Sequence, residues 1–150
     1  MPTPTVIAEK TIDDFSIGQE FSFSVTITKS DVERFAQLSG DINPLHMDDG
    51  FAEQRGFKGR VVHGLLLSGY LSRLVGVHFP GRHALLHGIN INFLSPAYVN
   101  DTVNIECIVN QISLSTRIII LKVVMKNLKN NNVLLRAKVQ VGFTQTNGLR

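Results

Sequence analysis

"VVHGLLLSGYLSRLVG", residues 61–76, predicts one helix from about Gly64 to Val75. At about 1.5 Å per residue this helix would span roughly 18 Å. A helix on the surface of a globular protein shows a polar stripe, whereas apolar side chains here occupy much of the circumference. We therefore expect the helix to be buried on most of its sides. The apolar side chains are Leu65, Leu66, Leu67, Tyr70, Leu71, Leu74 and Val75.

The rest of the chain predicts a sheet around this helix. Apolar and polar residues alternate from Phe21 to Thr28, which is typical of a half-buried strand. After Pro80-Gly81 the sequence predicts strands at residues 85–94, 103–109, 118–125 and 133–143, with a hairpin turn at 130–132. Asparagine tolerates the left-handed geometry of such turns. Long antiparallel strands and one apolar helix indicate an α+β fold, in which a strongly curved sheet wraps around the helix.

Two short helices are expected between the first strand and the long helix. Ser30 and Glu33 form a capping-box pattern, which predicts a helix from about Asp31 to Leu38. Pro44 biases the residue before it toward extended geometry, so the stretch that follows the first short helix reads as a loop. Asp48 or Asp49 then caps a second short helix that ends near Gln54.

Length and composition limit the classes of function. The 150 residues favour one domain, and a single cysteine, Cys107, excludes an intrachain disulfide. The N-terminal stretch MPTPTVIAEKTIDDF predicts neither a signal peptide nor a membrane span. The net charge of +3 is spread along the chain, which argues against nucleic-acid binding but suits a phosphate-bearing ligand or an acidic carrier protein. His78, His83 and His87 lack a nearby carboxylate cluster, so no metal site is expected.

Asp41 and His46 are the first candidate functional pair. Their spacing of five residues puts them about 140° apart on a helix and on opposite faces of a strand. They can therefore converge only in an irregular loop, which Pro44 would stiffen. An acid and a base held together suit the activation of a water molecule with return of its proton. The alternative is an ordinary Asn-Pro turn followed by a surface histidine.

His63-Gly64 is the second candidate feature, because it begins the long helix. A helix N-terminus presents unpaired N–H groups, and Gly64 would leave room for a ligand to approach them. Such groups stabilise a carbonyl oxygen that develops negative charge. The alternative is a helix that begins in close packing with another backbone segment. Ser72 lies two turns beyond Gly64 on nearly the same face and would either face a ligand or bond a helix carbonyl.

The motifs GDINPLH (residues 40–46) and FAEQRGFKGRVVHGLLLSGYLSRL (residues 51–74) resemble the MaoC-like hydratase/dehydratase family. Within that family the sequence is most similar to the single-domain (R)-specific enoyl-CoA hydratases, over about residues 15–143. The resemblance implies a single hot-dog domain at 1–150, with one long helix inside an antiparallel sheet. It also implies a homodimer with active sites near the subunit interface.

Residue by residue, the resemblance makes Asp41 and His46 the catalytic pair and Asn43 the amide that helps to hold it. It makes Gly64 the backbone N–H donor to the thioester oxygen and Ser72 a supporting serine. No metal and no cofactor are implied. Two departures are Arg60, where some members have proline, and Asn100-Asp101, where a Gly-Asp turn is common.

The function so implied is reversible syn addition of water to a trans-2-enoyl-CoA, giving (R)-3-hydroxyacyl-CoA, in the cytoplasm and in fatty acid metabolism. The main alternative is a (3R)-hydroxyacyl-acyl-carrier-protein dehydratase. Further alternatives are an acyl-CoA thioesterase and a non-catalytic acyl-thioester-binding subunit. Leu65, Leu66, Tyr70 and Phe93 are candidates to line an acyl tunnel, but they equally suit the core.

Overall fold

In the computed structural model, which describes residues 5–144, five strands form one antiparallel sheet in the order β1-β3-β4-β5-β2. The first four and last six residues of the expected domain at 1–150 lie outside the described residues. The strands are β1 Glu20–Thr26, β2 Ala84–Phe93, β3 Thr102–Ser113, β4 Ile118–Asn127 and β5 Val133–Phe143. The predicted strands are therefore confirmed, each to within a few residues at its ends.

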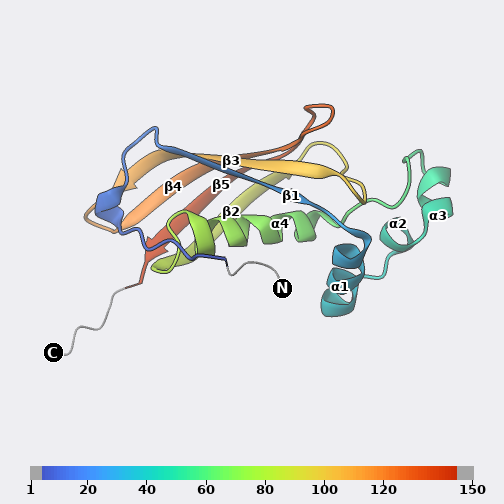
Figure 1. Cartoon of the computed structure of the whole chain (residues 1–150), viewed down its shortest axis with the longest axis horizontal. Coiled ribbons are helices and arrows are strands. Elements are labelled where there is room, and N and C mark those ends of the chain that lie inside the picture. Colours follow the sequence, from blue (N-terminus) through green and yellow to red (C-terminus); the bar gives the residue numbers. More distant parts are fainter. Residues whose placement is uncertain (1–4, 145–150) are drawn as a thin grey trace.

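The helices are η1 Ile12–Asp14, α1 Lys29–Ser39, α2 Pro44–Met47, α3 Asp49–Gln54, α4 Gly64–Arg73 and the π-helical turn η2 Leu74–His78. Figure 1 shows α4 lying along one face of the sheet, with α1, α2 and α3 gathered beyond its N-terminal end. None of the helices in the described part of the chain is long and apolar enough to cross a membrane. The expected α+β arrangement of one long helix against one sheet is present.

The core lies between α4 and the sheet. Alternate residues of β3, β4 and β5 are buried, including Ile105, Leu121 and Val139, and they meet Leu71 and other buried residues of α4. The expectation of a helix buried on most sides holds only for this face. On the opposite side Leu65 is 69% exposed, and Gly69 and Ser72 are also exposed. One side of α4, which carries Leu65, Gly69 and Ser72, is thus left uncovered in the single chain.

The predicted cap of α1 at Ser30 is wrong, because the capping box lies two residues earlier. The Asp31 N–H donates to Thr28 Oγ1 at 3.1 Å, and the Thr28 N–H donates to Asp31 Oδ2 at 2.8 Å. Thr28, two residues after the end of β1, has the extended backbone that a cap requires. At the other end the helix stops at Gly40, which has the left-handed φ of 79° that favours glycine.

The expected loop around Pro44 is partly wrong, since Pro44–Met47 form the one-turn helix α2. Asn43 caps this turn: its Oδ1 accepts the Leu45 N–H at 2.9 Å. Proline at the first helical position needs no hydrogen bond from its nitrogen and has a suitable fixed φ. The Asp48 side chain caps α3, as predicted.

His78 is the last residue of η2, which follows α4, and its side chain contacts β1. Its ring packs on Phe21 and Phe23, at centroid distances of 5.4 and 4.8 Å, and its Nε2 accepts a hydrogen bond from Arg73 Nε at 3.2 Å. Burial, and secondly the Arg73 charge, lower the pKa of His78 below its ordinary value of 6.5. The neutral ring is therefore the form that the folded protein favours.

We expect the free energy of unfolding to fall on acidification because of His78. The unfolded chain binds the proton more readily, so the stabilisation is fully present above about pH 6.5 and is lost as the pH falls through the lower pKa of the folded state. Urea unfolding at pH 8 and pH 5.5 should show a smaller acid loss for His78→Gln than for the wild type. Equal losses in the two proteins would contradict this role of His78.

Candidate active site

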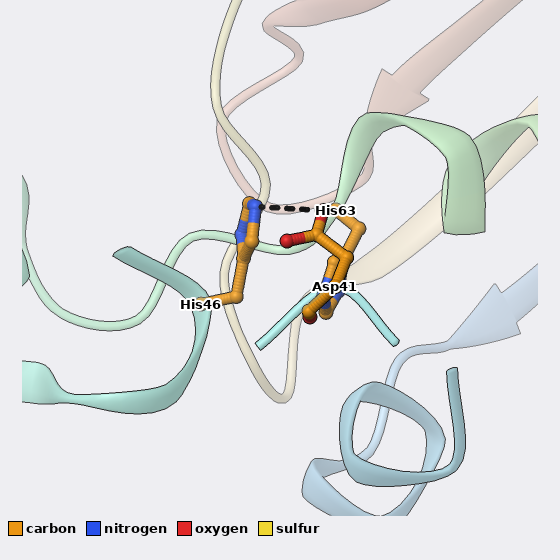
Figure 2. A group of neighbouring side chains, drawn as sticks. All are labelled: Asp41, His46 and His63. Atoms are coloured by element: carbon orange, nitrogen blue, oxygen red, sulfur yellow. Dashed lines mark hydrogen bonds and ion pairs between the residues drawn. The ribbon is translucent and has the colours of Figure 1, made fainter. Parts of the chain in front are cut away.

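Asp41 and His46 meet at the N-terminal end of α4. Asp41 lies in the connection after α1, His46 lies on α2, and His46 Nε2 is 3.8 Å from Asp41 Oδ2. Figure 2 shows the imidazole and the carboxylate facing each other across this gap. The Asp41 side chain is about half exposed, whereas that of His46 is mostly covered. The predicted convergence is confirmed, although α2 rather than a loop carries the histidine.

The hydrogen bond that His46 Nδ1 makes determines the tautomer of the ring. Nδ1 lies 2.7 Å from the carbonyl oxygen of Val61. A carbonyl oxygen can only accept, so Nδ1 must carry a proton and donate it. In the neutral ring Nε2 then presents its lone pair to the space beside Asp41. His46 is therefore held in the form that can take a proton from a bound water.

Local turns fix Asp41 on the other side of the gap. The Asn43 N–H donates to Asp41 Oδ1 at 3.2 Å, and the Asp41 N–H donates to Ser39 Oγ at 3.1 Å. Asn43 thus connects both members of the pair, since it bonds the Asp41 carboxylate and caps the helix that carries His46. The bond to Asp41 comes from the Asn43 backbone, and the side-chain amide, to which the resemblance assigns the holding role, makes the cap of α2.

His63 is a third member of the cluster, and the sequence pattern assigns its side chain no role. It is 2% exposed, and its ring stacks on that of His46 at a centroid distance of 3.9 Å. Its Nε2 lies 2.9 Å from the Asp41 carbonyl oxygen and donates to it. Among the described side chains, His63 Nδ1 is buried without a hydrogen-bond partner. His63 therefore ties the Asp41 backbone to the ring of His46.

Donor atoms of Asp41, His46 and His63 lie within 4.8 Å of one another, which raises the question of a metal. Zinc binds a histidine nitrogen at about 2.0–2.1 Å, along a lone pair in the plane of the ring. The two rings are stacked, with only 25° between their planes, so their lone pairs lie in nearly parallel planes and do not converge on one point. This geometry does not favour a shared metal ion.

The N-terminus of α4 begins directly beside the cluster. Within the described part of the chain, the N–H groups of Gly64 and Leu65 donate no hydrogen bond, and His63 provides no side-chain cap. These groups, with the positive end of the helix dipole, can stabilise an oxyanion. The space that Gly64 leaves is filled by the ring of Phe93, which an added Cβ would meet at 3.0 Å. The expected open room at Gly64 is therefore partly taken.

Ser72 is not brought into the cluster within this chain. It lies eight residues along α4 from Gly64, about 12 Å at the rise of a helix, and it is exposed. Of the candidate tunnel residues, Leu66 belongs to the core, whereas Leu65 and Phe93 are 69% and 49% exposed. The structure thus joins Asp41, Asn43, His46 and Gly64, and it separates Ser72 from them.

Comparison with known proteins gives a family match over residues 14–132 to the MaoC like domain. An (R)-specific enoyl-CoA hydratase of Rhodospirillum rubrum is 37% identical over 91 residues, which cover 61% of this chain and 63% of that protein. The alignment thus spans less than two thirds of that relative. A mitochondrial 3-hydroxyacyl-[acyl-carrier-protein] dehydratase of Arabidopsis thaliana is 34% identical over 97 residues, covering 65% and 56%.

A solved structure is similar to this chain both in fold and in sequence. It is that of an (R)-hydratase from Aeromonas caviae involved in PHA biosynthesis, with a TM-score of 0.81 and 30% identity over 85% of this chain and 96% of that one. The agreement over 85% of this chain confirms the hot-dog fold that the sequence resemblance implies.

Proposed function

This chain belongs to the MaoC-like domain family, and from that premise we propose that it adds water reversibly to a trans-2-enoyl-CoA, giving (R)-3-hydroxyacyl-CoA. The observation that carries the proposal is the free lone pair of His46 Nε2, which faces Asp41 Oδ2 at 3.8 Å. The hydratases of Rhodospirillum rubrum and Aeromonas caviae support the choice of reaction.

Asp41 and His46 share one water molecule in this mechanism. Their facing atoms are too far apart for a direct hydrogen bond, and a water at about 2.8 Å from each would lie to one side of the line between them. As the water oxygen bonds the β-carbon of the substrate, His46 Nε2 takes one of its protons. Asp41 orients the water, and the pair returns one proton to the α-carbon. The net reaction consumes one water and leaves both residues unchanged.

The N-terminus of α4 binds the thioester carbonyl oxygen. Its free N–H groups, at Gly64 and Leu65, polarise the carbonyl and make the β-carbon electrophilic. They also stabilise the enolate-like state that forms when the β-carbon accepts the water oxygen. The half-exposed ring of Phe93 lies against Gly64 and is placed to contact the acyl chain.

We further propose that the protein is a homodimer that pairs through β2. This ten-residue strand lies at an edge of the sheet, and exposed apolar side chains gather along it and beside the start of α4. An unpaired apolar edge strand is a ready surface for pairing with a second copy. Ser72 lies on the uncovered side of α4, so its supporting role depends on this interface. The apolar side chains are Leu65, Leu85, Leu86, Phe93 and Leu94.

Sedimentation equilibrium tests the dimer. Leu86→Glu should produce a monomer, because it buries a charge at the proposed interface. Leu38→Glu is the matched control, since Leu38 is 86% exposed on α1 and belongs to neither β2 nor α4, and this variant should remain a dimer. A wild-type monomer at micromolar concentration would contradict the proposal.

We also propose that residues of about 15–143 act as one domain.

We propose that the protein works in the cytoplasm. Cys107 is the only cysteine and is buried within β3, where burial raises the pKa of its thiol to about 12. An inert thiol of this kind needs no oxidising compartment. Expression of a fluorescent fusion would test the location.

The same chemistry on an acyl carrier protein is the second candidate, and the Arabidopsis relative supports it. Matched crotonyl thioesters of coenzyme A and of the carrier separate the two. We expect faster turnover of the coenzyme A substrate, and a preference for the carrier would favour the dehydratase. Release of a free thiol would instead indicate a thioesterase, and binding without turnover would indicate a non-catalytic subunit.

A further inference from the structure

Arg60 is a buried cation close to the candidate site. Its residue exposure is 8%, and it is the one charged side chain among the buried polar residues of the described chain. Burying a guanidinium group is costly unless hydrogen bonds and an opposite charge compensate for it. The partners of Arg60 therefore indicate what its burial achieves.

All three nitrogens of the Arg60 side chain face elements that surround the catalytic pair. Nε donates to the carbonyl oxygen of His46 at 2.6 Å, and Nη1 lies 3.7 Å from Glu33 Oε1 on α1. Nη2 lies 3.9 Å from the sulfur of Met47. The short donor–acceptor distance to His46 marks a charge-assisted hydrogen bond. His46 is the last residue but one of α2, and its carbonyl has no partner within the turn itself.

The next residue, Val61, holds His46 from the other side. The Val61 N–H donates to the Leu45 carbonyl at 3.1 Å, and the Val61 carbonyl accepts the proton of His46 Nδ1 at 2.7 Å. Residues 60 and 61 therefore fix both the backbone and the ring of His46. The Arg60 N–H also donates to Asp49 Oδ1 at 2.9 Å, which fixes this segment against α3.

We propose that Arg60 is a positioning residue that holds the Nε2 lone pair of His46 toward Asp41. The proposal rests on the proposed hydratase function. A one-turn helix has too few internal hydrogen bonds to hold its own orientation, so the Arg60 bond to the His46 carbonyl helps to hold the backbone that carries the ring. Lysine cannot replace it, because an ammonium lacks the planar fork that reaches His46, Met47 and Glu33 together.

The kinetic test compares Arg60→Met with Glu33→Gln. Methionine keeps much of the apolar stem but removes every side-chain donor, so kcat on crotonyl-CoA should fall about 10- to 100-fold with little change in KM, since small misplacements cost this much. Glu33→Gln removes the ion pair but leaves the bond to His46, so its kcat should stay within about threefold of the wild type. A wild-type kcat in Arg60→Met, or equal losses in both variants, would overturn the proposal.

A second readout does not depend on activity. In protein labelled with ¹⁵N-histidine, the Nδ1–H of His46 should give a protected proton signal in the wild type and in Glu33→Gln. This signal should broaden or disappear in Arg60→Met, while the Nε2–H of His63, bonded to Asp41, serves as the internal reference. If Arg60→Met does not fold, Arg60→Lys is used with the same expectation.

An unchanged His46 signal in the folded variant would overturn the positioning role even if activity falls. A wild type without hydratase activity would instead refute the proposed function, and the His46 signal would still decide whether Arg60 holds the ring. The two failures are therefore distinguishable.

Discussion

Replacement of His46 by glutamine should lower the rate of crotonyl-CoA hydration by about 10²- to 10⁴-fold, the range expected for loss of a general base. Glutamine is polar and of similar size, but it has no lone pair basic enough to take a proton from water. Because the ring is held by one hydrogen bond to Val61 and by stacking on His63, the fold should survive the change. Initial rates at equal concentrations of folded protein provide the measurement.

His83→Gln is the matched control for His46→Gln. His83 lies just before β2, and in the hydrogen bonds it makes within the described chain its backbone carbonyl accepts from Thr144. Its replacement should leave the hydration rate within about twofold of the wild type. A His46→Gln protein that retains more than a tenth of the wild-type rate would contradict the role of His46 as the base.

Asp41→Asn should cause the second large loss, again of about 10²-fold or more. Asparagine can still accept a hydrogen bond from the Asn43 N–H, so the turn should persist, but it can neither carry the negative charge nor exchange a proton with the α-carbon. Asp13→Asn, at an exposed position in η1, is the control that should keep full activity.

The double variant tests whether Asp41 and His46 act on the same water. Residues that act as a unit are strongly non-additive. The Asp41→Asn/His46→Gln protein should therefore be little slower than the slower single variant. A loss equal to the product of the two single losses would show that the residues act independently.

Much of the fold can be predicted from the sequence because it rests on periodicity. The alternation in β1 and in β3 to β5 and the apolar stretch of α4 are long enough to determine element type and buried face. The turns at Asn100 and Asn131 also agree, with φ values of 72° and 61°. The exposed side of α4 could not be predicted, because a run of apolar residues does not distinguish a face packed in the core from a face that another subunit would cover.

Short elements are harder to predict, since competing local signals decide them. Two overlapping patterns, Thr28–Asp31 and Ser30–Glu33, both fit a capping box, and the end of β1 selects the first. The helix α2 is a single turn, too short for any periodicity. Its cap at Asn43 and its proline at the first position were the available signals.

The surroundings of the site could not be predicted from local pattern. His63 reaches Asp41 across 22 residues, and Arg60 reaches His46 across 14. Sequence spacing therefore indicates that Asp41 and His46 can meet, but not that His63 and Arg60 hold them. Contacts of this kind depend on how α2 packs against the segment before α4.

The most direct test of the central claim is the initial rate of crotonyl-CoA hydration by the wild type and by Asp41→Asn, with the product enantiomers resolved. We predict that the wild type forms (R)-3-hydroxybutyryl-CoA and that Asp41→Asn is at least about 10²-fold slower. Equal rates in the two proteins, or a wild type that forms no hydroxyacyl product, would contradict the account.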